Sequence, residues 1–398
     1  MCRRETLLFK PDSADEFSAT RPCTEARSSV IKVLLLIPTL DRSGAEKQFT
    51  LLATRLPKDE FEVHAATLTR GGPYEADLRD AGIPLTALNK RMKFDPAALF
   101  KLRKLVRKLK PDVLHTWLFA ANAYGRMAVG KAATTRVLVG ERCVDLWKSG
   151  WQLQIDRLLS SRATRLIGNS AAVAQFYRQQ GFPDERIVVI PNGVDVAEPA
   201  SVSRDAVLAE FDIPPGAKVV GFVGRLARQK RVNDLVWAMQ LLRQLTDNVY
   251  FLVIGDGPER PRLMRLARQL TCDALTRFVG HRNDATRLIG LLDVFWLASD
   301  FEGMSNSVME AMAAAVPVVV SDIPTNRELV VDGETGFFVK VGDSVGFAQF
   351  ADRILAERDL AGRLGNAGRA RLQAEFSVER MIESYVTLYR QVVSPDYS

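Results

Sequence analysis

The chain is poor in residues that bind metal ions or form disulfide bonds. Its 398 residues include four cysteines and three histidines. The cysteines are spread without a Cys-x-x-Cys pair, at Cys2, Cys23, Cys143 and Cys272. We therefore expect free thiols in a reducing compartment, no metal site and no cofactor.

Long apolar segments are also absent. No run approaches the roughly 20 residues that a membrane-spanning helix needs. Residues 1–28 are polar and aperiodic, without the apolar stretch of a signal peptide, and we expect a disordered tail there. These absences predict a cytoplasmic protein that would meet a membrane only at its inner face.

The charge balance of the chain is basic. Its formal net charge is +7 and its isoelectric point is about 9.3. This balance favours anionic partners, namely nucleotides, nucleic acid or an anionic membrane surface, and does not choose among them. Hydrophobic residues make up 47% of the chain, as in ordinary globular proteins, and its length favours two domains.

Short apolar segments alternate with helical patterns along most of the chain. Val30–Ile37 is almost continuously apolar, as is typical of a parallel strand covered on both faces. The other strand-like segments fall into two series, first 62–68, 113–115, 136–139, 164–168 and 187–190, then 219–223, 250–254, 276–279, 294–297 and 316–320. This alternation predicts an α/β protein with parallel sheets and crossover helices.

Turn residues near position 200 separate the two series. We expect a first Rossmann-like domain over 29–198 and a second over 199–376. The remaining segment, 377–398, carries a helix that we expect to pack back on the first domain. Two doubly wound domains that face each other place a ligand cleft at the carboxyl ends of both sets of strands.

The strongest local motif is Phe301–Glu310, which follows a predicted strand and leads into a helix-forming stretch. Gly303 is small enough for the backbone to approach a ligand closely. The free N–H groups and the dipole at the helix start would hold a diphosphate. Glu302 and Glu310 would face different parts of that ligand; a loop cap and a surface acid are the alternative.

The segment from Glu302 to Val339 resembles the signature of the retaining glycosyltransferases of family 4. The matching pieces are Met309–Met312, Pro317–Val319, Arg327-Glu328 and Asp332–Phe337. The resemblance extends over roughly residues 30–390 and implies the GT-B fold, in which two Rossmann-like domains face each other across a cleft.

This resemblance implies a site for a nucleotide-diphosphate sugar. Glu302 would contact the donor sugar, and Glu310 would bind the ribose hydroxyls. The phosphates would lie against the backbone of Gly303, Met304, Ser305 and Asn306.

Two basic residues complete this donor site. Arg225 and Lys230 match an Arg and a Lys that clamp the diphosphate in the family; by itself, the cluster would be a solvated basic loop. Fixed cations stabilise the charge that develops on a leaving diphosphate. The chain has no Asp-x-Asp pair, so we expect these side chains to take the place of a metal ion.

Further residues are assigned by the same resemblance. Arg282 lies in a stretch similar to the base-binding loop of the family, with a plain loop as the alternative. Gly44 belongs to a turn similar to the family's Gly-Gly-Ala-Glu, with Ser43 in place of the first glycine. Arg142 follows a predicted strand, and we expect it in the cleft.

One departure from the family concerns a histidine. Family members carry one in the loop after the strand that corresponds to Val113–His115, close to the reacting sugar. Here His115 stands at the start of the motif, and the more typical position falls on Trp117 or Ala120. His115 is a candidate for substrate contact, and a buried histidine at a strand end is the alternative.

Residues 95–110 predict a basic amphipathic helix. Asp95 would cap it, and one face carries an apolar stripe. The other face carries Lys101, Arg103, Lys104, Arg107, Lys108 and Lys110. This face is either solvated or docks on anionic headgroups of a membrane. Aromatic residues are not interleaved with these cations in the pattern of a nucleic-acid-binding segment, so we expect no nucleic-acid partner.

These observations predict a retaining, metal-independent glycosyltransferase. Its donor would be a nucleotide-diphosphate sugar, and its acceptor a hydroxyl of a glycan or lipid-linked glycan. A sugar-nucleotide epimerase on the same fold and a catalytically weak nucleotide-sugar-binding subunit are the alternatives.

Overall fold

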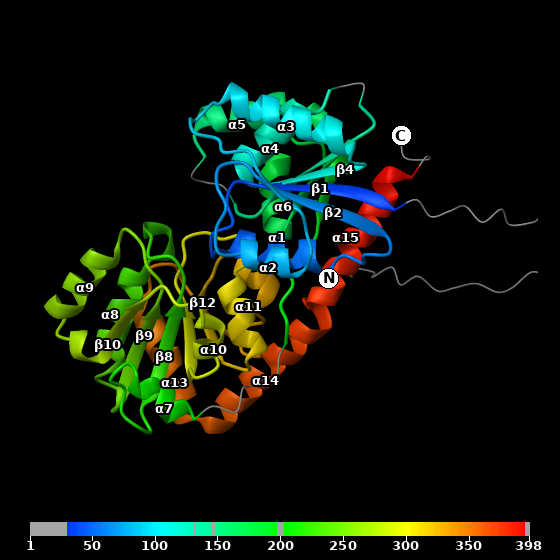
Figure 1. Ribbon diagram of the computed structural model, residues 1–398. Helices are drawn as coiled ribbons and strands as arrows, with labels where there is room; N and C mark the ends of the chain where they lie inside the picture. Colours follow the sequence, from blue (N-terminus) through cyan, green and yellow to red (C-terminus); the bar gives the residue numbers. More distant parts are fainter. Residues whose placement is uncertain (1–29, 131–132, 145–147, 197–202, 395–398) are drawn as a thin grey trace, which may run out of the picture.

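A computed structural model describes residues 30–130, 133–144, 148–196 and 203–394. The tail predicted over 1–28 lies outside the described residues. The chain forms two α/β domains, each built on one parallel sheet. Figure 1 shows the N-terminal domain above and the C-terminal domain below. The predicted fold class is confirmed.

The N-terminal domain contains a seven-stranded sheet in the order β3-β2-β1-β4-β5-β6-β7. Alternate side chains of the interior strand β1 enter different apolar clusters: Leu35 lies on one face and Leu34 on the other. Both are fully buried, which explains the continuous apolar run. The elements are β1 (Ile31–Ile37), α1 (Gly44–Arg55), β2 (Phe61–Thr67), α2 (Glu75–Asp80), β3 (Leu85–Ala87), α3 (Pro96–Leu109), β4 (Val113–Trp117), α4 (Leu118–Ala128), β5 (Arg136–Glu141), α5 (Gly150–Leu158), η1 (Ser160–Arg162), β6 (Arg165–Gly168), α6 (Ala171–Gln179), η2 (Asp184–Arg186) and β7 (Ile187–Val189).

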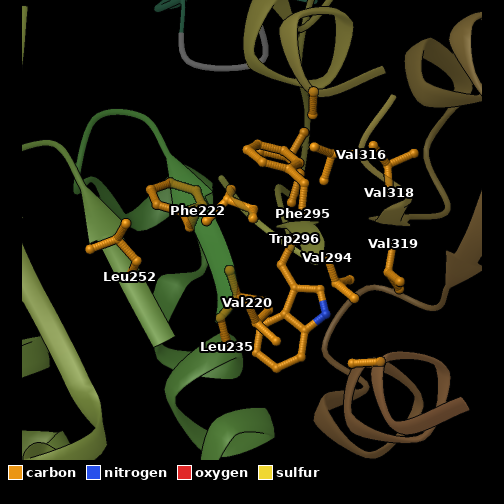
Figure 2. Close-up of a cluster of buried hydrophobic side chains, with 14 of the residues drawn as sticks. Val220, Phe222, Leu235, Leu252, Val294, Phe295, Trp296, Val316, Val318 and Val319 are labelled. Carbon is orange, nitrogen blue, oxygen red and sulfur yellow. The ribbon is translucent and has the colours of Figure 1, made fainter. Parts of the chain in front are cut away.

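The C-terminal domain contains a six-stranded sheet in the order β10-β9-β8-β11-β12-β13. Phe295 and Trp296, neighbours on β11, point to opposite faces of this sheet and pack in the buried cluster of Figure 2. The elements are α7 (Arg204–Ala209), β8 (Lys218–Val223), η3 (Arg228–Lys230), α8 (Val232–Leu242), β9 (Val249–Ile254), α9 (Arg260–Gln269), η4 (Asp273–Leu275), β10 (Thr276–Gly280), α10 (Ala285–Ile289), β11 (Val294–Leu297), α11 (Asn306–Ala313), β12 (Val318–Ser321), α12 (Pro324–Leu329), β13 (Gly336–Val339), α13 (Ser344–Ala356) and α14 (Arg358–Glu375).

The last helix, α15 (Val378–Val393), crosses from the C-terminal domain to the N-terminal domain (Figure 1). The Ser377 hydroxyl caps it by accepting a hydrogen bond from the Arg380 amide. Its buried face lies in the same apolar cluster as β1 and α1. That face consists of Val378, Met381, Ile382, Tyr385, Val386, Leu388, Tyr389 and Val392. The helix is therefore part of the N-terminal core.

Candidate active site

Loops at the carboxyl ends of the two sheets meet where the domains touch. We call this contact the domain junction; it comprises residues 44–48, 142–144, 192–193, 302–306 and 310, together with Lys230, which is paired with Glu302. Asn192, after β7, donates to the Met304 carbonyl at 3.1 Å and to Asn306 Oδ1 at 2.8 Å. Asn306 donates to the Gly44 carbonyl at 2.9 Å. The segment predicted to cradle phosphates thus contacts the N-terminal domain directly.

Gly303 lies against the backbone of the opposite domain. A Cβ atom at this position would come within 1.9 Å of the Arg142 carbonyl oxygen. The neighbouring carbonyl of Glu302 accepts a hydrogen bond from the Val144 amide at 3.2 Å. Only glycine permits this approach, so the residue is required by the contact between the domains.

The start of α11 lies at the same place. Ser305 is its N-cap residue, but its side chain makes no capping hydrogen bond. Met304 and Ser305 are buried. The first N–H groups of α11 therefore keep their capacity to bind an anion, as the helix dipole also favours.

Glu302 is buried and paired with Lys230. Lys230 Nζ and Ser299 Oγ each donate to Glu302 Oε1 at 2.5 Å. Lys230 ends the short helix η3, which follows β8. The two residues assigned to the donor sugar and the diphosphate thus lie side by side, 72 positions apart in sequence.

Arg225, the other predicted clamp residue, is exposed in the loop after β8. Its guanidinium forms no ion pair with the residues that the structure describes. The structure therefore holds Lys230 beside Glu302 and leaves Arg225 free to reach a ligand.

Glu310 joins the two domains through an ion pair with Lys47 of α1. Lys47 Nζ lies 2.5 Å from Glu310 Oε1, and the carboxylate is mostly buried. Burial raises the pKa of nearby Tyr74 to about 12, with the Arg42 charge opposing and the Glu310 charge adding to the rise. Lys47 was not predicted from sequence, because nothing local marks a partner 263 residues away.

Arg142, after β5, lines the junction from the N-terminal side. One guanidinium nitrogen donates to Tyr385 Oη at 2.6 Å and another to Asn192 Oδ1 at 3.4 Å. Its guanidinium carbon lies 3.6 Å from the centre of the Trp117 ring. The residue is 8% exposed.

His115 lies in the core next to Trp117 and Tyr385, the two residues that contact the Arg142 guanidinium. Its ring is fully buried among Trp117, Tyr385 and Tyr389, and its Nδ1 lies 2.7 Å from Tyr389 Oη. Complete burial, with the Arg142 charge adding, holds the pKa of His115 well below its ordinary value. In this structure His115 is a neutral core residue that does not reach the junction surface.

Arg282 is not brought to the junction. It is paired with Asp284 at 2.8 Å, lies 3.8 Å from a Glu210 oxygen and stacks over the Phe211 ring.

A pocket between α2 and β3, lined by Glu75, Arg79 and Leu85 among others, contains none of the predicted site residues.

Within the described chain, no group of three or more His, Cys, Asp or Glu side chains is placed to hold a metal ion. No helix of that part of the chain is long and apolar enough to cross a membrane.

Two facing parallel α/β domains, with acid–lysine pairs and a helix start at their junction, define a glycosyltransferase of the GT-B class. Comparison with known proteins agrees. Residues 203–371 match the family model described as glycosyl transferases group 1, and residues 42–198 match glycosyltransferase family 4.

Relatives cover most of the chain. A glycogen synthase of Mycobacterium tuberculosis is 31% identical over 307 residues, 73% of this chain and 71% of that protein. The lipopolysaccharide core biosynthesis glycosyltransferase LpsE of Rhizobium meliloti is 29% identical over 347 residues, 87% and 95% of the two chains. This chain belongs to the family 4 (group 1) glycosyltransferases.

A solved structure shows the same fold. Anabaena HepE in complex with UDP-glucose is 21% identical and superposes with a TM-score of 0.80. The match covers 90% of this chain and 99% of that one.

Proposed function

We propose that this glycosyltransferase moves a sugar from a nucleotide-diphosphate donor to a hydroxyl of a glycan or lipid-linked glycan. It does so with retention of anomeric configuration and without a metal ion. The observation that carries the proposal is the Glu302–Lys230 pair beside the start of α11, at the contact between the domains. The name of LpsE, a lipopolysaccharide core enzyme, and the UDP-glucose bound to HepE support this choice of substrates.

The donor would lie mainly on the C-terminal domain. Its diphosphate binds the backbone of Gly303–Asn306 and the cations of Arg225 and Lys230. Glu310 accepts hydrogen bonds from the ribose hydroxyls, and Glu302 contacts the sugar. The ion pairs with Lys230 and Lys47 hold the carboxylates of Glu302 and Glu310 in place.

The reaction needs one bond to form and one to break at the anomeric carbon. The acceptor oxygen bonds to that carbon on the face from which the diphosphate leaves, which gives retention. The leaving diphosphate takes the acceptor proton. Lys230, Arg225 and the amides at the start of α11 stabilise the charge that develops on the diphosphate.

The membrane is the proposed location of the acceptor. Residues 90–110 contain nine basic side chains and one acid, Asp95, whose carboxylate caps α3 through the amides of Ala97 and Ala98. Apolar side chains stand exposed in the same segment: Met92 is 61%, Phe94 60% and Phe100 61% exposed. Cations with exposed aromatic and apolar residues suit an anionic bilayer surface.

The decisive experiment measures donor binding and product stereochemistry. Thermal shifts with a panel of nucleotide diphosphates and nucleotide sugars, in EDTA, should show stabilisation by one nucleotide series. At a ligand concentration one hundred times the dissociation constant, binding should raise the free energy of unfolding by about 2.7 kcal/mol. NMR of the product should then show the anomeric configuration of the donor.

Three results would contradict the proposal. Binding that EDTA abolishes would indicate a metal-dependent donor site, and an inverted product would exclude retention. Donor binding without transfer to any acceptor would instead indicate a nucleotide-sugar-binding subunit.

A further inference from the structure

Arg142 is a buried cation without a carboxylate partner among the described residues. Its hydrogen bonds go to the neutral groups of Tyr385 and Asn192, and its flat face rests on Trp117. Its Nε atom has no hydrogen-bond partner. A guanidinium normally uses its five donors on carboxylate or phosphate oxygens.

The glutamates near Arg142 form ion pairs with lysines and not with Arg142. Glu141, the adjacent residue, accepts from Asn122 at 2.9 Å and lies 3.4 Å from the buried Lys148 amine. Glu302 and Glu310 are each held by a lysine. The imidazole of His115 is neutral and cannot offset the charge.

An unpaired buried charge is costly, and a ligand that supplies the opposite charge removes that cost. The surroundings of Arg142 also fix its orientation. Trp117 supports it from β4, and Tyr385 holds it from α15. The cation is thus pre-organised, which lowers the cost of binding an anion.

We propose that Arg142 is the centre of an anion site on the N-terminal side of the domain junction, and that it binds a phosphate group of the acceptor. The inference rests on the proposed function. The acceptor is the source favoured by position, because Arg142 and both of its aromatic supports belong to the N-terminal core. The donor cations, Arg225 and Lys230, belong to the other domain.

The test uses the full chain, UDP as the donor mimic and inorganic phosphate as the probe. UDP is titrated first by calorimetry, and phosphate is then titrated into the UDP-saturated chain at matched ionic strength. Phosphate should bind the UDP complex. Arg142→Gln should weaken phosphate binding by about tenfold or more and leave UDP affinity within about twofold.

Two further variants complete the test: one removes a hydrogen bond that positions Arg142, and the other is a control for the loss of one positive charge. Tyr385→Phe keeps the charge and the ring but removes the hydrogen bond, and it should weaken phosphate binding less than Arg142→Gln does. If Arg142→Gln fails to fold, the loss of phosphate affinity in Tyr385→Phe still tests the site. Arg178→Gln removes an exposed arginine of the same domain, paired with Asp184, and should leave both affinities unchanged.

Each other outcome overturns the inference. Phosphate that competes with UDP would assign the anion to the donor diphosphate. Equal phosphate binding by wild type and both junction variants would mean an adventitious ion only, and no phosphate binding would mean no site. If UDP does not bind, the nucleoside diphosphate that stabilises the chain in the thermal-shift panel replaces it in both titrations. Failure of every nucleoside diphosphate in the panel would count against the proposed function, which the first titration measures separately.

Discussion

At the scale of single residues, the domain junction is organised by two glutamate–lysine pairs. Glu302 and Lys230 come from one domain, while Glu310 and Lys47 join the two. Each lysine neutralises a buried carboxylate that would otherwise be costly to keep charged. The site is therefore charged but balanced before a donor arrives, and the donor meets cations that are already in place.

Removing the Lys230 amine should slow the reaction. Lys230→Ala deletes a cation next to the predicted position of the diphosphate, and turnover should fall by more than about tenfold, the equivalent of about 1.4 kcal/mol. Steady-state kinetics with the donor found by the binding panel would measure this. Arg228→Ala, an exposed neighbour that pairs with Glu259, is the matched control. Unchanged turnover in Lys230→Ala would remove Lys230 from the clamp.

Burial of His115 should make stability depend on pH. The pKa of His115 is held well below its ordinary value in the folded chain, so the unfolded chain binds the proton more readily. Its contribution is complete above about pH 6.5 and is lost as the pH falls below that value. The free energy of unfolding should therefore decrease on acidification, by up to about 1.4 kcal/mol per pH unit from this group.

Urea unfolding of wild type and His115→Gln would measure this contribution. The two curves of unfolding free energy against pH should run parallel above about pH 7.5 and converge towards pH 5. Parallel curves over the whole range would show that the ring is accessible to protons in the folded chain.

At the scale of elements, the loop between β11 and α11 depends on one glycine. Gly303→Ala places a methyl group against the Arg142 carbonyl, so the loop and the opposite domain must separate. Overpacking of this kind costs about 1–3 kcal/mol. We expect catalytic efficiency to fall at least tenfold, with a lower melting temperature.

A matched change tests whether the effect is local. Gly362→Ala, in α14, has nothing within 4 Å of the new methyl group and should leave kinetics unchanged. Equal kinetics of Gly303→Ala and wild type would show that the loop does not need its close contact.

Most elements were predictable because parallel strands covered on both faces are continuously apolar, as β1 is. Two strands were not predicted. The edge strand β3 (Leu85–Ala87) has three residues, none of them fully buried, and β13 (Gly336–Val339) opens with glycine in a turn-rich motif. Neither carries a periodic signal long enough to be recognised.

The site was predictable only in part. The Phe301–Glu310 segment could be recognised because its residues are consecutive. The Lys47–Glu310 pair and the Tyr385–Arg142 hydrogen bond join residues 263 and 243 positions apart, and only the folded chain brings them together. The roles assigned to Glu302, Glu310, Arg225 and Lys230 stay predictions.

At the scale of the whole molecule, the Lys47–Glu310 pair joins the two domains. We call the arrangement with this contact made closed and one with the domains apart open, and we expect the pair to favour the closed one. Lys47→Met removes the pair, and because Lys47 is about a third exposed the loss should be about 1 kcal/mol or less. The ratio of open to closed molecules should then rise by up to about fivefold.

Small-angle scattering of the ligand-free variant should show a larger radius of gyration, which saturating UDP reverses. Lys58→Met, which removes a bond within the N-terminal domain to the Ala81 carbonyl, is the control. Identical scattering of Lys47→Met and wild type would exclude the pair as a closing contact.

Membrane docking is also a property of the whole molecule. In Figure 1, α3 lies on the side of the N-terminal domain remote from the C-terminal domain. Replacing Lys104, Arg107 and Lys108 with Gln should weaken binding to phosphatidylglycerol vesicles by about a hundredfold, since each cation near the surface contributes about 1 kcal/mol.

The control replaces the exposed Arg262, Arg265 and Arg268 of α9 with Gln and keeps the net charge change equal. Phosphatidylcholine vesicles should bind all forms weakly. Equal losses in the two triple variants would show that net charge, rather than α3, determines vesicle binding.

The return of α15 has a consequence for synthesis on the ribosome. The N-terminal domain is translated first, yet eight of its buried side chains arrive with the last helix. The core of the C-terminal domain ends at Phe376 and is complete before them. We expect the domain made first to finish folding last, and its exposed apolar face to need chaperones until α15 has been made and has packed. A premature stop codon within α15 would then damage the first domain and spare the second.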